Sequence, residues 1–175
     1  MHKLEPSIIL VRPQLPENIG LAARAMQNCG FNKLIIVSPR EKWPNQKAID
    51  AAANAYSIIK KTKVFNTIGE ALSKNHFAIA TSARRRYLPK PHKRNFLSLF
   101  SDIPVKKKVA ILFGPEKSGL SNDDLMLCDC VFSMPLSTKN HSLNLSHSVL
   151  LMAYKWQEFF KNFKIITPNS KMPSD

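Results

Sequence analysis

A basic segment, TSARRRYLPKPHKR at residues 81–94, carries the densest group of chemically useful side chains in this chain. Its cations surround Tyr87 and His92. Arginine clusters with an interleaved aromatic ring suit phosphate backbones and unstacked bases, which is how single-stranded loops of RNA are held. The alternative is a solvated run of charge. The cations assigned to RNA binding are Arg84, Arg85, Arg86, Lys90, Lys93 and Arg94.

A second segment, FGPEKSGL at residues 113–120, places Gly114 and Gly119 around Glu116, directly after an apolar run. A phosphate-binding loop needs the pattern GxxxxGK[ST], and here Glu116 stands where the second glycine should precede the lysine. The pattern therefore argues against a nucleoside triphosphate site, whereas the backbone of such a loop can embrace an adenosine. The alternative is a tight turn from a strand to a helix, with Ser121 as the N-cap.

A third segment, PENIGLAARAM at residues 16–26, brings together an amide, Asn18, and a guanidinium, Arg24. Gly20 and the alanines keep a helix slim enough for another backbone to approach closely. From the spacing alone, a capped helix with one solvated arginine is the competing interpretation, and it stays open.

A fourth segment, HSLNLSHSVLLMAYKW at residues 141–156, places Ser142, Asn144 and Ser146 in front of a long apolar helix. Serine and asparagine compete with the backbone inside a helix, but they accept hydrogen bonds from the free N–H groups of a first turn. Capping alone explains them, unless other residues place them in a site. The helix itself carries one apolar stripe, a core or subunit contact, formed by Val149, Met152, Trp156, Phe159 and Phe163.

The elements that position these segments alternate between strands and helices. Most strand runs are apolar on both faces, which is typical of a parallel sheet covered by helices. We therefore predict the α/β class, with an open, mainly parallel sheet and helices on both faces. Gly30 is the predicted stop of the first helix. Strands are predicted at residues 7–11, 33–39, 76–82, 109–114 and 130–135, and helices at 16–30, 45–61, 67–75, 121–128 and 144–163.

Ligands of open parallel sheets bind beyond the carboxyl ends of the strands. The loops that follow the predicted strands at residues 12–20, 82–91, 114–119 and 136–144 carry the polar and glycine residues, and we expect them at that edge. A further basic run, KKK at residues 106–108, precedes a strand instead. It is therefore expected at the opposite edge, and its contribution to an RNA footprint has little weight.

Composition fits one domain with a polyanionic partner. Of the 175 residues, 44% are apolar, which suffices for one core. The formal net charge of +14 is too large for a neutral surface preference and indicates a polyanion. We expect a single domain over residues 1–163 and a polar tail over residues 164–175. The longest N-terminal apolar run, residues 8–11, is too short to span a membrane, so a soluble, cytoplasmic protein with no membrane partner is expected.

The three cysteines form an odd set without a CxxC pair. Cys29, Cys128 and Cys130 have apolar neighbours and are expected to be reduced, mostly buried thiols. No cluster of metal-ligand residues is evident in the sequence, so no metal is expected.

Three of these segments resemble, in order, the motifs of the SpoU/TrmH-type RNA 2'-O-ribose methyltransferases of the SPOUT superfamily. They read PENIGLAARAMQNCGF, VAILFGPEKSGL and FSMPLSTKNHSLNLSHSVLLMAY, and the match spans residues 8 to about 156. IDAAANAY and TSARRRYLP further resemble the branch that contains the TrmJ tRNA methyltransferases.

The resemblance implies a C-terminal trefoil knot in the sheet, a homodimer, and S-adenosylmethionine as cofactor. True knots are almost absent from proteins, so no general rule would have predicted one. By motif position, the implied cofactor contacts are Thr81, Ser82, Ala83, Gly114, Glu116, Met134, Leu136, Ser142, Leu143 and Asn144.

The implied reaction is methyl transfer to a ribose 2'-hydroxyl of RNA, with tRNA preferred, rRNA possible and no metal required. The branch points to position 32 in the anticodon loop; position 34, rRNA, or an inactive RNA-binding module are the alternatives. The family gives Arg24 the key role, and we expect it to clamp a phosphate and stabilise oxyanion charge, because an arginine pKa above about 12 conflicts with a general base. Asn18, Glu116, Ser142 and Asn144 are expected to orient Arg24 and the ribose.

Overall fold

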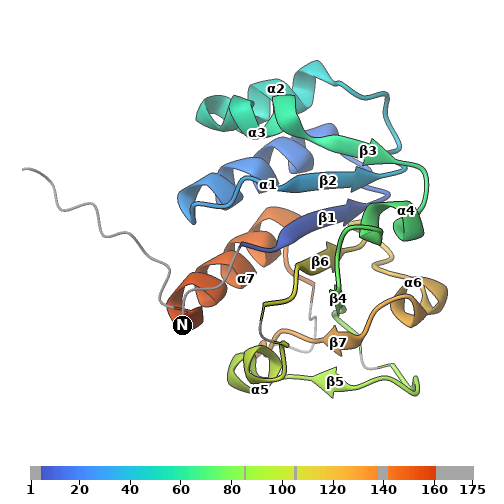
Figure 1. Ribbon diagram of the computed structural model, residues 1–175. Helices are drawn as coiled ribbons and strands as arrows, with labels where there is room; N and C mark the ends of the chain where they lie inside the picture. Colours follow the sequence, from blue (N-terminus) through green and yellow to red (C-terminus); the bar gives the residue numbers. More distant parts are fainter. Residues whose placement is uncertain (1–4, 85, 105, 138–141, 161–175) are drawn as a thin grey trace, which may run out of the picture.

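The computed structural model describes residues 5–84, 86–104, 106–137 and 142–160. Within them, seven parallel strands form one sheet in the order β3-β2-β1-β6-β4-β7-β5 (Figure 1). The predicted open parallel sheet is therefore confirmed. The strands are β1 Ser7–Val11, β2 Leu34–Val37, β3 Lys63–Phe65, β4 Phe77–Thr81, β5 His92–Lys93, β6 Val109–Phe113 and β7 Cys130–Phe132.

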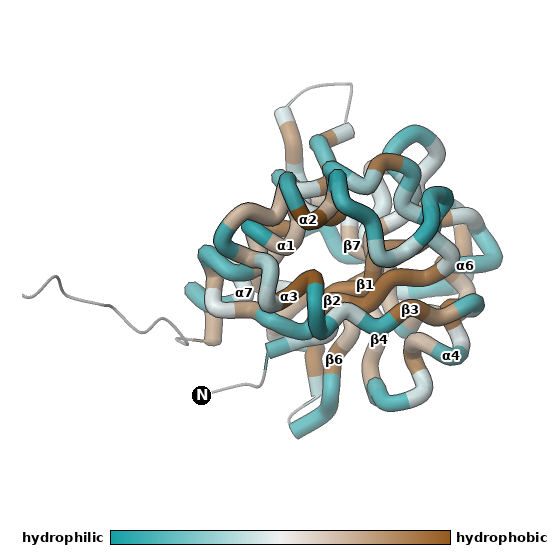
Figure 2. The backbone as a smooth tube through the Cα atoms, turned by 90° about the horizontal axis from the view of Figure 1, so that it is seen from above, coloured by the Kyte–Doolittle hydropathy of each residue, from teal (hydrophilic) through white to brown (hydrophobic). Residues whose placement is uncertain are grey.

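Helices cover both faces of this sheet, as the apolar strand runs predict. Successive side chains of a strand point to opposite faces, so Ile8 and Leu10 join one buried cluster and Ile9 and Val11 the other. In Figure 2 the apolar strands run through the middle of the molecule, between more hydrophilic loops. Helices α1 Pro16–Asn28, α2 Gln46–Ala52, α3 Tyr56–Lys61, α5 Phe96–Ser101 and α7 Leu145–Phe160 pack on the first cluster, and α4 Ile68–Leu72 and α6 Asn122–Met126 on the second.

Three short elements were not predicted. Strand β3 and helix α5 lie in stretches that the sequence left unassigned, and β5 lies inside the basic segment. The helix predicted at 45–61 is broken into α2, a 3-10 turn at Ala53–Ala55 and α3, because Ala53 leaves the helical region with φ 47°. The last predicted strand ends early, at Phe132.

Helices α1 and α2 pack closely through Gly20, as predicted. A Cβ on Gly20 would lie 2.3 Å from the carbonyl oxygen of Ala48 and 2.7 Å from Cβ of Ala51. Gly30, with φ +74°, follows the end of α1, which confirms the predicted stop.

Replacing Gly20 by alanine is expected to destabilise the fold by about 1–3 kcal/mol, because two backbones must separate to admit the methyl group. Gly69→Ala is the matched control: it also lies in a helix, but its nearest outside atom, Oγ1 of Thr67, is 4.0 Å away. That change should be neutral or stabilise by up to about 1 kcal/mol. Urea unfolding of the two variants checks this, and equal stabilities would contradict the close approach.

Helix α7 buries most of its predicted stripe. Val149, Met152 and Trp156 are fully buried, whereas Phe159 is 36% exposed while it contacts Phe100. Phe163 lies outside the described residues, as do the predicted domain boundary at 163 and the tail at 164–175. The predicted knot involves the segment between β7 and α7, of which residues 138–141 lie outside the described residues, so the knot stays a prediction.

The cysteines are buried free thiols, as predicted. Burial, reinforced by the nearby charge of Asp129, raises the pKa of both Cys128 and Cys130 to about 12, and burial also raises the pKa of Cys29. Thiols with such pKa values are inert as nucleophiles. Over the described ranges, no helix is long and apolar enough to cross a bilayer.

Candidate functional site

The loops that follow β4, β6 and β7 meet at the carboxyl edge of the sheet and line one cleft together with the segment before α7. Every residue predicted to contact the cofactor lines this cleft, except Asn144. Three sequence segments, at residues 81–83, 114–116 and 134–143, are thus brought to one place. Their members in the cleft are Thr81, Ser82, Ala83, Gly114, Glu116, Met134, Leu136, Ser142 and Leu143.

The glycine-containing loop after β6 folds back on itself to form one wall of this cleft. The N–H of Gly119 donates to the carbonyl of Pro115 at 2.8 Å, and Gly119 has φ +67°. A Cβ on Gly114 would lie 2.3 Å from the backbone nitrogen of Leu120, so only glycine fits there. Ser121 caps α6, accepting from the N–H of Asp124, as predicted. The loop is therefore both a tight turn and a wall of the cleft.

Glu116 joins this loop to the start of α1. Its carboxylate accepts hydrogen bonds from the backbone N–H of Gln14 at 2.8 Å and of Leu15 at 3.3 Å, and from Nδ2 of Asn18 at 3.1 Å. Three donors on one carboxylate fix both segments relative to each other. Asn18 and Glu116, two of the predicted site residues, are thus in direct contact.

Arg24 is not part of this contact. Arg24 follows Asn18 by about 1.7 helical turns, so the two side chains leave α1 in different directions. Its side chain is exposed and does not line the cleft. Within the described ranges, it forms no hydrogen bond or ion pair. The guanidinium therefore faces solvent in the described part of this subunit.

The polar residues before α7 divide their tasks. Oδ1 of Asn144 accepts hydrogen bonds from the backbone N–H of Ser146 at 2.9 Å and from its hydroxyl at 2.7 Å, which makes Asn144 the N-cap of α7. Ser142, two residues earlier, lines the cleft. Asn144 therefore acts as a helix cap, whereas Ser142 is part of the cleft wall.

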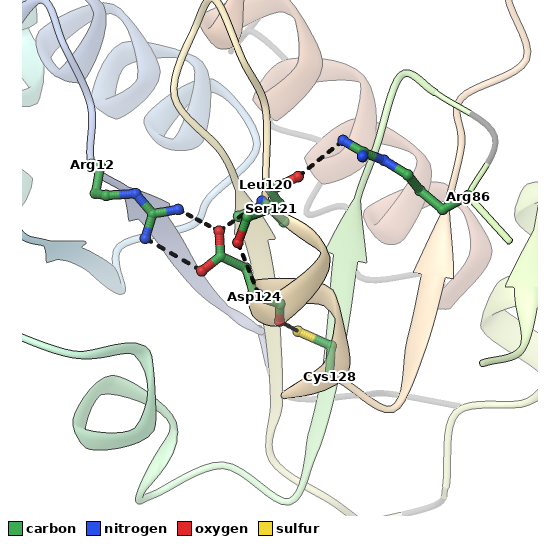
Figure 3. Close-up of polar contacts among 6 residues, drawn as sticks. All are labelled: Arg12, Arg86, Leu120, Ser121, Asp124 and Cys128. Carbon is green, nitrogen blue, oxygen red and sulfur yellow. Dashed lines mark hydrogen bonds and ion pairs between the residues drawn. The ribbon is translucent and has the colours of Figure 1, made fainter. Parts of the chain in front are cut away.

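Half of the basic segment is engaged within the protein. Arg86 donates from Nη2 to the carbonyl of Leu120 at 3.2 Å and so lies against the glycine loop (Figure 3). Its Nη1 also donates to Oδ1 of Asn122 at 3.2 Å. Lys90 donates to the carbonyl of Cys128 at 2.6 Å. Lys93 forms an ion pair with Asp102. These three cations therefore have partners within the protein and hold the basic segment against its neighbours.

The remaining cations of the segment face outward. Arg84 and Arg94 are exposed, and Arg84 also lines the cleft. Tyr87, between them, is 89% exposed. Arg85 lies outside the described residues. Of the cations and the aromatic ring predicted for RNA contact, Arg84 lies at the cleft, and Tyr87 and Arg94 are exposed on the same segment.

The sequence did not predict an ion pair that joins the end of β1 to α6, the helix that follows the glycine loop. Arg12, at the end of β1 with φ 48°, donates through both terminal nitrogens to both carboxylate oxygens of Asp124 in α6 (Figure 3). Asp124 also accepts from the N–H of Ser121 at 2.8 Å. The pattern SxxD at 121–124 is a capping-box signature and would have pointed to Asp124, but nothing in the sequence pairs it with Arg12.

Burial acts to raise the pKa of Asp124, but the hydrogen bonds from Arg12 and Ser121 outweigh it, and the pKa is lowered. A carboxylate with a lowered folded-state pKa stabilises the fold above its unfolded pKa, and this contribution is lost as the pH falls through the folded value. We expect Asp124→Asn to be less stable than the parent at pH 6, with the difference shrinking once the pH falls below about 3.8. Urea unfolding across this range measures it.

Asp123→Asn removes the same charge from the neighbouring position of α6 and serves as the control. If Asp124→Asn and Asp123→Asn have equal stability at pH 6, the ion pair does not contribute.

An open parallel sheet with a cleft built by the loops after three adjacent strands is the arrangement in which α/β proteins commonly bind their ligands. The chain belongs to the SpoU rRNA Methylase family, whose model matches residues 5–154. This confirms the resemblance inferred from the three motifs.

Individual relatives place the chain near the TrmJ proteins. It is 34% identical over 151 residues to the tRNA (cytidine/uridine/adenosine-2'-O-)-methyltransferase TrmJ of Pseudomonas aeruginosa, covering 85% of this chain and 58% of that protein. It is 36% identical over 155 residues to the tRNA (cytidine-2'-O-)-methyltransferase TrmJ of Methanocaldococcus jannaschii, covering 85% and 66%. The chain thus spans less than two thirds of the length of these relatives. The crystal structure of TrmJ from Z. mobilis ZM4 superposes with a TM-score of 0.84 at 39% identity, covering 94% of this chain and 73% of that one.

Among the residues that the structure describes, no group of three or more His, Cys, Asp or Glu side chains is placed to hold a metal ion.

Proposed function

We propose that this chain is an S-adenosylmethionine-dependent tRNA methyltransferase that modifies a ribose 2'-hydroxyl. The observation that carries the proposal is the cleft in which the three motif loops meet, with Glu116 bound to Asn18 at its edge. The TrmJ relatives, which are named as tRNA 2'-O-methyltransferases, support the reaction and the substrate class. We propose a cytoplasmic location, because the proposed substrate, tRNA, is present there.

The chemistry of the cleft fits the cofactor. Met134, Leu136 and Leu143 offer apolar surface to a nucleoside, and Gly114 allows a ligand to approach the backbone closely. The hydroxyl of Thr81 donates a hydrogen bond to the carbonyl of Leu112, and the hydroxyl of Ser82 donates one to the carbonyl of Arg84. Residues 81–83 would therefore contact the cofactor mainly through their backbone.

When bound, S-adenosylmethionine supplies a methyl group on a positively charged sulfur, so the electrophile needs little activation. The tasks of the protein are alignment of the ribose and stabilisation of charge on its oxygen. The 2'-oxygen would take the methyl group as the methyl–sulfur bond breaks and a neutral thioether leaves, and its proton would pass to water or to a neighbouring basic group. Glu116 holds Asn18 and the start of α1 in place for this alignment, and Ser142 lies on the cleft wall where it can orient the ribose.

Arg24 is proposed to act across a homodimer. It is exposed and away from the cleft of its own subunit, which suits a guanidinium that serves the cleft of a partner. Helix α7 exposes an apolar face, formed by Leu150, Leu151 and Tyr154, between 37% and 49% exposed. Apolar side chains at this spacing on one helix are a suitable dimer contact. Arg24 would clamp a phosphate of the RNA and stabilise the developing oxyanion.

The experiment that tests the proposal incubates the purified chain with methyl-labelled S-adenosylmethionine and either bulk tRNA or rRNA. Label is expected in ribose of tRNA, and a tRNA that lacks the target 2'-hydroxyl should accept none. Label in a base, or no transfer to any RNA, would contradict the proposal. Mapping the labelled nucleotide decides between position 32 of the anticodon loop, which we propose, position 34 and rRNA. An inactive RNA-binding module would bind tRNA without transfer.

A further inference from the structure

The amino edge of the sheet, opposite the cleft, carries a band of exposed lysines that the proposed reaction does not use. They precede or begin strands instead of following them, so they lie at the other ends of the strands. Within the described residues, the ion pairs join Arg12 to Asp124, Lys93 to Asp102 and Lys155 to Glu158, and none involves this band. We call the following exposed residues the amino-edge lysines: Lys33, Lys60, Lys61, Lys106, Lys107 and Lys108.

The strand register places the first half of this band at one edge. Strand β3 pairs with β2 so that Lys63 lies opposite Ile35, and Lys60 and Lys61 are the last residues of α3, just before that strand. The carbonyl of Lys33 accepts from the N–H of Ile8 in β1 at 2.9 Å. The lysines before β2 and β3 therefore lie at the amino ends of two neighbouring strands.

The second half continues the band beyond β1. Ser7 of β1 lies opposite Ala110 of β6, so Lys108 stands just outside the end of the central strand. Its backbone is fixed to β4: its N–H donates to Nδ1 of His76 at 3.2 Å, and its carbonyl accepts from the N–H of His76 at 2.8 Å. Lys74, two residues before His76, is also exposed. From β3 to β6 the band extends about 14 Å, three strand spacings.

The carboxylates at this edge do not neutralise the band. Glu5 accepts from the N–H of Asn32 at 2.8 Å, and Asp129 accepts from the N–H of Ala78 at 2.7 Å, so both bind backbone amides. The charge of Lys33 acts on Glu5, so this single carboxylate offsets only part of the charge of the six lysines. Like charges gathered on one edge repel one another unless an anion lies between them. The edge is therefore suited to a polyanion.

We infer that the amino edge is a second RNA-binding surface, which holds phosphates of the substrate remote from the nucleotide in the cleft. Lysine is a flexible point charge, suited to phosphate contacts that position an RNA without reading its sequence. The two edges are separated by the length of a strand, about 17 Å for five residues. Only an RNA longer than a few nucleotides reaches both. The inference rests on the proposed function only in taking RNA as the ligand.

The test compares two edge variants, Lys60→Gln/Lys61→Gln and Lys107→Gln/Lys108→Gln, with a control of equal charge, Lys42→Gln/Lys47→Gln. Lys42 and Lys47 are exposed in the connection that follows β2, at the carboxyl side. Affinity for a whole tRNA and for a single-stranded octanucleotide is measured by fluorescence anisotropy between about 50 and 200 mM salt. No cofactor is added, so the readout is independent of methyl transfer.

Each edge variant is expected to bind tRNA about tenfold more weakly at low salt, with the slope of log affinity against log salt reduced by about 2, one unit per lost phosphate contact. The octanucleotide should lose clearly less affinity than tRNA in the edge variants, because it offers the edge far fewer phosphates when one of its nucleotides lies in the cleft. The control variant should keep the tRNA-to-octanucleotide affinity ratio of the parent.

Unchanged tRNA binding by both edge variants would overturn the inference, as would an equal loss of affinity for tRNA and octanucleotide. Loss of binding to vesicles of anionic lipid with tRNA binding intact would also overturn it and assign the edge to a membrane surface. If the chain transfers no methyl group but the edge variants still lose tRNA selectively, the proposed function fails and this inference stands.

Discussion

Replacing Arg24 by alanine is expected to lower the rate of methyl transfer to tRNA by at least about 100-fold, while binding of S-adenosylmethionine stays within about twofold of the parent. Removal of a group that stabilises developing charge has an effect of this size. Arg24 does not line the cleft, so its loss should leave the cofactor in place. Transfer of label under single-turnover conditions, with calorimetric titration of the cofactor, measures both quantities.

Asn28→Ala is the control, because Asn28 is exposed one turn further along α1. It should retain full activity. A parallel loss of turnover and cofactor binding in the Arg24 variant would contradict the role assigned to the guanidinium.

Replacing Gly114 by alanine is expected to weaken cofactor binding by at least about 100-fold and to abolish transfer. The new Cβ would lie 2.3 Å from the nitrogen of Leu120 and 2.5 Å from the carbonyl carbon of Gly119. Neither backbone atom can yield unless the whole loop moves, and forced overpacking costs about 1–3 kcal/mol. Titration with the demethylated cofactor product, which does not react, measures the affinity, and circular dichroism shows whether the sheet still folds.

Gly119→Ala provides the comparison within the same loop. A Cβ there meets no atom within 4 Å, but the residue has φ +67°. This change should cost about 1 kcal/mol of stability and leave the cofactor affinity within about tenfold. Equal affinities for the Gly114 and Gly119 variants would show that the close approach at Gly114 does not shape the cleft.

Mixing the two inactive variants separates a site within one subunit from a site across two. If Arg24 serves the partner, a dimer of one Arg24→Ala subunit and one Gly114→Ala subunit contains one complete site. Random exchange of subunits should then restore about a quarter of the parental activity, because half of the dimers are mixed and each has one active site of two. No recovery on mixing would place Arg24 in its own subunit's site.

Much of this site was predictable because its loops contain glycines and polar residues that a loop with no function beyond linking two elements does not require. Glycines that flank Glu116 after an apolar strand, and an amide at Asn18, indicate where a backbone must bend and where a polar group is held. The rule that ligands bind beyond carboxyl ends then brings the loops together. Their assembly into one cleft follows from sheet order, in which β6, β4 and β7 are adjacent.

Other features depend on contacts between residues far apart in the sequence. Arg12 and Asp124 each look like ordinary surface residues until the fold brings the end of β1 next to α6. Arg84 and Arg86 look alike in the sequence, because both belong to the same basic run. Only Arg86 donates a hydrogen bond to the carbonyl of Leu120. Strand β5 consists of two polar residues whose pairing with β7 no periodicity reveals. The break at Ala53 lies in a run of small residues, mostly alanines, that by themselves favour a continuous helix.

The position of β1 in the middle of the sheet governs how this chain is made as well as how it works. Its neighbours are β2 on one side and β6 on the other, with Ser7 opposite Ala110. During synthesis at about 5–20 residues per second, β1 waits about 5–20 s for its second neighbour to be translated. Over that interval the edge of β1 that will pair with β6 stays unpaired, so it is open to pairing with another chain until β6 has been translated.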